Sequence, residues 1–131
     1  MINRRHGLAA LAAFSLALAG WGASAQEEKA YSPAALDAAI KAGQPVLIDV
    51  TATWCPTCKA QAPILSELAK QPRFKDLVVF KIDFDSQKDA LRSLKVQHQS
   101  TLIVLKGGAE VGRSVGDTNK ASIEALLSRA I

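Results

Sequence analysis

Residues 54–59 read Trp-Cys-Pro-Thr-Cys-Lys and hold both cysteines of the 131-residue chain. They follow a short β-rich run, Val46–Val50, and open a helical pattern that continues to about Lys70. A cysteine between a strand and a helix lies at the positive end of the helix dipole, which lowers the pKa of its thiol. Cys58, one turn further on, lies close enough to attack a mixed disulfide formed on Cys55. The segment therefore predicts thiol chemistry at the start of a helix.

The cysteine pair is poorly suited to a purely structural role. A disulfide that closes so short a loop removes little entropy from the unfolded chain. A tetrahedral zinc site needs two further ligands, and after residue 25 the chain has His98 as its single histidine and no other cysteine. We therefore predict redox chemistry and no zinc site.

The first 25 residues have the three parts of a secretory signal peptide. Arg4 and Arg5 give a positively charged start, Leu8–Gly20 is an apolar stretch, and Ala23–Ala25 supplies small residues for cleavage. A membrane-spanning helix needs about 20 apolar residues, so this stretch is too short for an anchor. We expect cleavage after Ala25, a periplasmic location, and no stable membrane insertion afterwards.

The composition is that of a globular domain, with 49% apolar and 21% charged residues, which excludes a disordered tail or a collagen-like repeat. Removing residues 1–25 leaves 14 basic against 12 acidic residues, a net charge of +2. The basic residues alternate with acids and form no run, so we expect no nucleic-acid partner. Residues 26–131 are predicted to form one domain.

The periodicity of apolar residues alternates between helical and extended along this domain. We expect helices over about 33–42, 56–70, 87–94 and 118–130, and strands over about 46–50, 77–82, 102–105 and 110–115. Strands separated by helices predict parallel crossovers, and the adjacent last two strands predict a hairpin closed by Gly107 and Gly108. The expected fold is α/β, a central mixed sheet with helices on both faces.

The motif of residues 54–59 has the form W-C-x-x-C-K and resembles that of the thioredoxin family. The resemblance extends from about Ser32 to Ile131. The family's buried acid, helix proline, lysine near the acid and hairpin glycines fall in register at Asp49, Pro63, Lys81, Gly108 and Gly116. The resemblance implies a thioredoxin fold and thiol–disulfide exchange with protein substrates that carry disulfides or thiols. We expect no cofactor, because the chain has no nucleotide-binding motif such as G-x-G-x-x-G.

The resemblance also implies roles for individual residues. Cys55 would be the nucleophile and Cys58 the resolving thiol, the two forming a reversible disulfide. Asp49 would accept the Cys58 proton, and its position in an apolar strand predicts a raised pKa, because burial disfavours the charged form. Lys81 would tune this acid.

Residues near the cysteines are expected to bind substrate: Trp54, Pro56, Thr57, Ser100 and Thr101. Family members carry a cis-proline where this chain has Ser100. A cis bond before serine would cost about 3 kcal/mol, so we expect the Gln99–Ser100 bond to be trans or strained. His98 is expected either as a solvated loop side chain or as a group that tunes Cys55.

Three functions are compatible with these residues. The leading hypothesis is a periplasmic reductase of protein disulfides, recharged by a membrane electron-transfer protein. The Pro-Thr pair between the cysteines looks like that of periplasmic reductases serving cytochrome c maturation. An alternative is a metal-binding or metal-delivery module that holds Cu(I) on the two thiolates, with His98 as a third ligand. A third, an inactive substrate-binding domain, is disfavoured because Cys55, Cys58 and Asp49 are intact.

Overall fold

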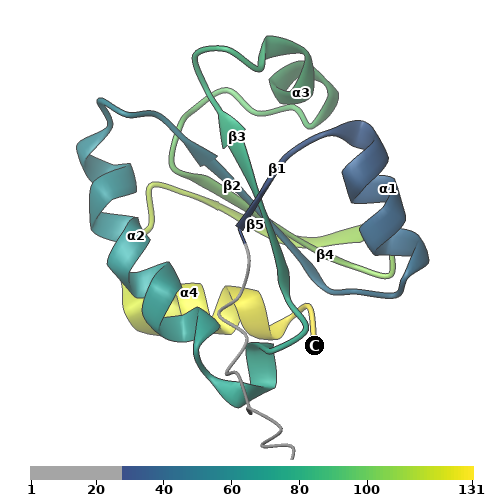
Figure 1. Cartoon of the computed structure of the whole chain (residues 1–131). Helices are drawn as coiled ribbons and strands as arrows, with labels where there is room; N and C mark the ends of the chain where they lie inside the picture. Colours follow the sequence, from purple (N-terminus) through teal and green to yellow (C-terminus); the bar gives the residue numbers. More distant parts are fainter. Residues whose placement is uncertain (1–27) are drawn as a thin grey trace, which may run out of the picture.

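A five-stranded mixed sheet forms the centre of the protein (Figure 1). The computed structural model describes residues 28–131, so the predicted cleavage site after Ala25 lies outside the described residues. The strand order is β1-β3-β2-β4-β5. The strands are β1 (Glu28–Ala30), β2 (Val46–Thr51), β3 (Val78–Asp83), β4 (Thr101–Lys106) and β5 (Ala109–Val115).

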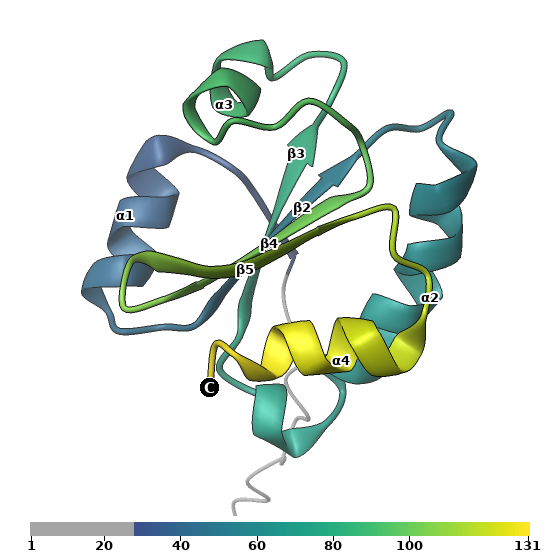
Figure 2. The same ribbon diagram turned by 180° about the vertical axis from the view of Figure 1, so that it is seen from behind.

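Helices cover both faces of this sheet, as Figures 1 and 2 show from opposite sides. Helices α1 (Pro33–Lys41) and α3 (Lys88–Ser93) lie on one face. Helices α2 (Pro56–Ala69) and α4 (Lys120–Ser128) lie on the other, and a short 3-10 helix, η1 (Pro72–Phe74), follows α2. The predicted fold class is confirmed. None of the helices in the described part of the chain is long and apolar enough to cross a membrane.

The alternation of side chains along the strands separates the core into two layers. In β2, Val46, Ile48 and Val50 are fully buried against α1 and α3. Leu47 faces the other way, into the layer beneath α2 and α4. A strand that is buried on both faces reads as a continuous apolar run. Asp49 interrupts this run.

The direction of β4 differs from the expected parallel crossover. β3 pairs with β2 in parallel, but β4 pairs with β2 antiparallel, through partners such as Val50 and Thr101. The connecting helix α3 has six residues and lies near the end where β3 finishes, so the chain re-enters the sheet from that same end (Figure 1). The C-terminal end of β2 and the beginning of β4 therefore lie side by side at the same end of the sheet.

The outer strands of the sheet are the β5 strand of a hairpin on one side and the short strand β1 on the other. The β4–β5 hairpin closes on Gly107 and Gly108, which both have positive φ, at 59° and 79°. Such a turn matches the twist of the strands and favours glycine at both positions. At the opposite edge, β1 is a strand that was not among the four expected from the sequence. Its three residues are exposed and pair with β3.

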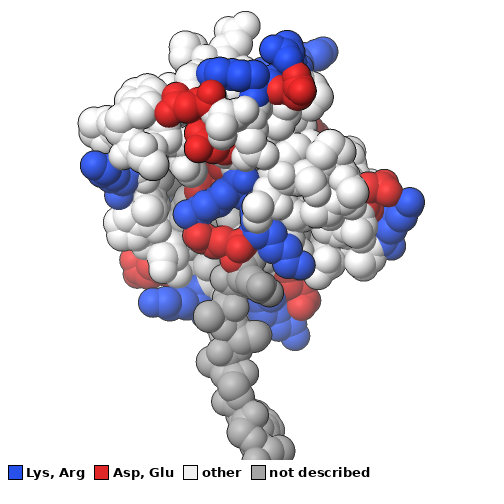
Figure 3. Space-filling view, turned by 45° about the horizontal axis from the view of Figure 1, so that its top comes forward, with Lys and Arg blue, Asp and Glu red and all other residues white. Residues whose placement is uncertain are grey.

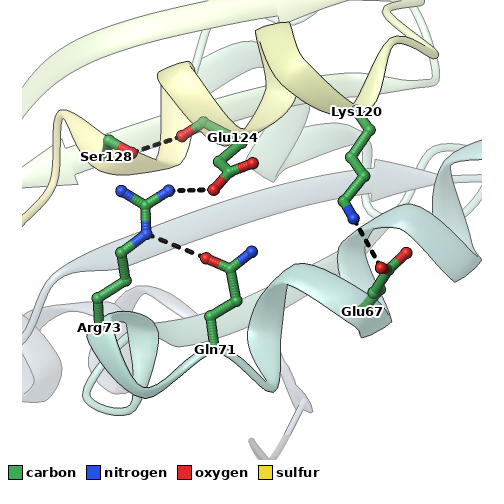
Figure 4. Close-up of polar contacts among 6 residues, drawn as sticks. All are labelled: Glu67, Gln71, Arg73, Lys120, Glu124 and Ser128. Atoms are coloured by element: carbon green, nitrogen blue, oxygen red, sulfur yellow. Dashed lines mark hydrogen bonds and ion pairs between the residues drawn. The ribbon is translucent and has the colours of Figure 1, made fainter.

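The contact between α2 and α4 combines a buried apolar layer with ion pairs at its surface. Leu68 and Leu127 belong to the buried layer. At the surface, Lys120 lies 2.6 Å from Glu67, and Arg73 pairs with Glu124 (Figure 4). Glu67 lies in the C-terminal half of α2 and Arg73 lies in η1, away from the two cysteines.

Candidate redox site

Cys55 and Cys58 form a disulfide where β2 gives way to α2, with their Cα atoms 5.3 Å apart. Cys55 is the N-cap of α2, and its Sγ accepts a hydrogen bond from the backbone N–H of Cys58 at 3.1 Å. Pro56 occupies the first turn, where its missing N–H leaves no partner unsatisfied. A thiolate on Cys55 would therefore lie at the positive end of a 14-residue helix, with an N–H group directed at it.

Ser100 lies against both sulfurs. Its Oγ is 3.1 Å from Cys55 Sγ and 3.1 Å from Cys58 Sγ. The residue is 2% exposed, so water does not compete for these contacts. The peptide bonds of the described residues are all trans, including Gln99–Ser100. The chain makes its turn here instead with a positive φ of 60° at Ser100.

The backbone of Ser100 is held on both sides. Its N–H donates to the carbonyl of Val50 at 2.8 Å, and its carbonyl accepts from the N–H of Gly116 at 3.0 Å. The Nε2 of Gln61 donates to the same carbonyl at 3.3 Å. These three bonds tie Ser100 to β2, to the end of β5 and to α2.

Gln61 is a buried polar residue of the site that the sequence analysis missed. It is 1% exposed, and its Nε2 also donates to the carbonyl of Asp117 at 2.8 Å. Its Oε1 is buried and accepts no hydrogen bond from residues 28–131. A signal was present in the sequence, because Gln61 lies on the buried stripe of α2 that otherwise carries Cys58, Leu65 and Leu68.

Asp49 is buried, as its apolar neighbours predict, and is 6% exposed. Burial raises its pKa to about 6, and the charge of Lys81 opposes part of that rise. Lys81 pairs with Asp49 in the β2–β3 register, and its Nζ lies 2.9 Å from Glu28. The carboxylate of Glu28 raises the pKa of Asp49 further. An acid with a pKa near neutral pH is suited to accept and return a proton.

These charged groups belong to a mixed surface. Figure 3 shows acidic and basic side chains alternating along the middle of one face, with uncharged areas on either side. Glu28 on the edge strand β1 and Lys81 on β3 form an exposed ion pair. Lys81 therefore interacts with Glu28 at the surface and, through its charge, with the buried Asp49.

The residues expected to bind substrate divide into an exposed and a buried group. Trp54 is 54% exposed, and its indole N–H donates to Asp85 at 2.8 Å. Pro56 is also exposed, and Thr57 is half-buried. Ser100 and Thr101 are 2% and 1% exposed. The structure does not place the side chains of these last two on the docking surface, because the loop before β4 folds inward.

The hydroxyl of Thr101 is bonded within its own loop, and the side chain of His98 is exposed to solvent. Thr101 Oγ1 donates to the carbonyl of His98 at 2.6 Å, whereas the His98 side chain is exposed. Among residues 28–131, no group of three or more His, Cys, Asp or Glu side chains could hold a metal ion. The structure therefore does not bring His98 to the cysteines as a third ligand, and the copper alternative is unsupported.

Comparison with known proteins gives consistent matches over most of the chain. The family model described as Thioredoxin matches residues 27–129. A thioredoxin of Mycobacterium tuberculosis (strain H37Rv) is 40% identical over 92 residues, which cover 70% of this chain and 78% of that protein. A thioredoxin of Echinococcus granulosus is 42% identical over 94 residues, covering 71% and 84%.

Solved structures agree with these matches. The crystal structure of Trxlp from Edwardsiella tarda EIB202 superposes with a TM-score of 0.75 at 46% identity. The superposition covers 77% of this chain and 98% of that one. The predicted family resemblance is confirmed by these findings.

Proposed function

The chain belongs to the thioredoxin family, and we propose that it reduces protein disulfides in the bacterial periplasm. Thiol–disulfide exchange at Cys55 and Cys58 is the activity of that family. The proposal rests on the cysteine pair at the start of α2, which follows a strand holding a buried acid, Asp49, whose pKa is about 6. The reductive direction is proposed from the similarity to thioredoxins, because the cysteine pair of thioredoxin has a low reduction potential of about −270 mV.

Each step of the exchange is assigned to a group of this chain. The Cys55 thiolate attacks a substrate disulfide, forming a mixed disulfide and releasing one substrate thiolate, which takes up a proton from water. Cys58 then passes its proton to Asp49 and attacks Cys55 Sγ. The second substrate thiolate leaves and takes the proton from Asp49. Two electrons pass from the protein to the substrate, and the Cys55–Cys58 disulfide remains.

Substrate docking would use the exposed surface next to the cysteines. Cys55 is 1% exposed with the disulfide closed, so its sulfur becomes accessible to a partner only when the surrounding surface shifts. Trp54 and Pro56 lie on that surface. Exposed aromatic side chains beside a buried reactive group suit contact with a protein rather than with a small molecule.

The periplasmic location is proposed from residues 1–25. Arg4 and Arg5, the apolar stretch Leu8–Gly20 and the small residues Ala23–Ala25 support export and cleavage. In that compartment the oxidised protein needs an electron donor, and a membrane electron-transfer protein is the partner that we propose. N-terminal sequencing of the protein from a periplasmic extract should begin at Gln26. Recovery with Met1 retained in the cytosol would contradict the location.

The direction of the reaction is tested by the reduction potential of the cysteine pair. The protein is equilibrated with glutathione or dithiothreitol, and the thiol fraction is measured by alkylation. We expect a value near about −270 mV, as for thioredoxin, whereas a value near about −120 mV would indicate a disulfide donor. Cys58→Ser should accumulate a mixed disulfide with a protein substrate, and the matched variant Cys55→Ser should not. Equal behaviour of the two variants would contradict the assigned order of attack.

A further inference from the structure

We propose that Ser100 is a catalytic residue, whose hydroxyl donates a hydrogen bond to the thiolate present at each stage of the exchange. The inference rests on the proposed exchange reaction at the same site. It does not depend on the direction in which the reaction runs. The role is distinct from substrate binding, because the hydroxyl lies among the reacting atoms.

The proposal rests on the position of the Ser100 hydroxyl between the two sulfurs. Ser100 Oγ lies 3.1 Å from each, and the residue is 2% exposed. Cys55 Sγ also accepts the N–H of Cys58, but the other polar atom near Cys58 Sγ is the carbonyl of Val50. A carbonyl cannot donate. The Ser100 hydroxyl is therefore the donor that the structure places beside Cys58 Sγ.

A donor in this position favours the reduced state. A disulfide sulfur is neutral and a weak acceptor, whereas a thiolate carries a full charge and accepts a much stronger hydrogen bond. In a site closed to water such a bond is stronger still. The hydroxyl therefore stabilises the dithiol state with its thiolate more than it stabilises the disulfide.

One hydroxyl can act in both half-reactions because it is equidistant from the sulfurs. Before attack it donates to the Cys55 thiolate. Once Cys55 is bonded to the substrate sulfur its charge is gone, and Cys58 becomes the thiolate by giving its proton to Asp49. Rotation of the Ser100 O–H then moves its hydrogen bond to Cys58 Sγ, which attacks Cys55. Ser100 gains and loses no proton, so the balance of the exchange is unchanged.

The backbone keeps this hydroxyl in place. A non-glycine residue with φ of 60° is sparsely populated and carries strain. The bonds from Gly116 and Gln61 to its carbonyl, and from its own N–H to Val50, hold it there. Strain that is maintained by three hydrogen bonds is expected at a functional position.

The test compares Ser100→Ala and Ser100→Gly with the wild-type protein. The pKa of Cys55 is measured from the pH dependence of its alkylation by iodoacetamide. We expect it to rise by about one to two units in both variants, because a charge-assisted hydrogen bond is lost. The equilibrium constant for reduction of the protein disulfide by glutathione should fall about tenfold. This corresponds to a reduction potential that is lower by about 30 mV. The titratable groups on the surrounding elements, Asp49, His98 and Asp117, are the same in all three proteins.

Comparing the two variants distinguishes the effect of the hydroxyl from the effect of the backbone conformation. Glycine tolerates the positive φ freely, whereas alanine keeps a Cβ there. An equal shift in both assigns the effect to the hydroxyl. A shift in Ser100→Ala alone, or an unchanged pKa in both, would overturn the proposal.

Ser114→Ala is the matched control. It also removes a buried serine hydroxyl, one without a hydrogen-bond partner in the described residues and located on β5. We expect it to leave the Cys55 pKa unchanged, and an equal shift there would count against Ser100. A wild-type reduction potential near that of a disulfide donor would overturn the reductive direction but leave this comparison intact.

Discussion

The two halves of helix α2 bury different kinds of side chain. In the N-terminal half, Cys55 caps the helix, and the inward positions hold Cys58 and Gln61. In the C-terminal half the inward positions hold Leu65 and Leu68, and Glu67 stays on the surface in an ion pair with Lys120 of α4 (Figure 4). One continuous helix therefore joins a polar interior at the redox site to an apolar interior beneath α4.

This difference separates stability from chemistry along the helix. A buried polar group costs free energy unless hydrogen bonds compensate its lost hydration. Burial of apolar side chains is the dominant favourable contribution to folding. We infer that the C-terminal half stabilises the fold and that the N-terminal half uses part of that stability to hold reactive groups in a dry site. Substitutions in each half can test this division.

The largest loss of stability is expected for Leu68→Ala, at the apolar end. Leu68 is 0% exposed and packs in the layer shared with α4. The cavity should lower the free energy of unfolding by about 2–5 kcal/mol, measured by urea denaturation of the oxidised protein. The reduction potential should stay at the wild-type value. A shifted potential would show that the two halves are coupled.

Asp49→Asn, at the polar end, is expected to raise the free energy of unfolding. The pKa of Asp49 is raised from 3.8 to about 6, so the folded protein holds this proton more tightly than the unfolded chain does. The wild-type protein therefore loses stability as the pH rises from 3.8 to about 6, and the loss is complete above that pH. A difference of about two pKa units corresponds to about 3 kcal/mol, which the asparagine variant would recover above that pH.

The pH dependence distinguishes this effect from a change in packing. The stability difference between Asp49→Asn and wild type should vanish toward pH 3.8 and reach its full size above pH 6. Thiol–disulfide exchange by the variant should be slower, because Cys58 loses its proton acceptor. A stability difference that is constant with pH would contradict the raised pKa of Asp49.

A smaller effect is expected for Gln61→Leu, which makes the N-terminal half resemble the C-terminal half. The substitution removes the bonds to the carbonyls of Ser100 and Asp117 but also removes a buried oxygen without a partner. We expect the free energy of unfolding to change by about 1 kcal/mol or less. The alkylation rate of Cys55 should change more clearly, since Ser100 loses one of its anchors. Unchanged reactivity would mean that Gly116 and Val50 suffice to hold Ser100.

Much of this division could be predicted from the sequence. The apolar periodicity located four helices and four of the five strands in the described part of the chain. The position of Asp49 within an apolar run predicted its burial. These features succeed because each depends on neighbours close in sequence.

The rest depends on contacts between distant segments. β1 has three exposed residues and pairs with β3 through its backbone, so no apolar pattern reveals it. The inward turn at Ser100 depends on partners at Val50, Gln61 and Gly116, which only the fold brings together. The antiparallel direction of β4 likewise follows from where α3 packs. Local patterns therefore locate the cysteines, whereas the family resemblance places Ser100 near them and only the fold shows its hydroxyl between the two sulfurs.

The smallest effect is expected at the Arg73–Glu124 ion pair, beside the C-terminal end of α2 (Figure 4). The two side chains are 44% and 32% exposed, so water screens their charges. Arg73 also lies over the ring of Phe74 at 4.5 Å and donates to Gln71, so a single substitution removes several contacts. A double-mutant cycle with Arg73→Met and Glu124→Gln isolates the pair, and we expect a coupling below about 1 kcal/mol that falls further in salt. A coupling of about 2 kcal/mol or more would mean that polar groups stabilise this end as well, and the contrast between the two halves of α2 would fail.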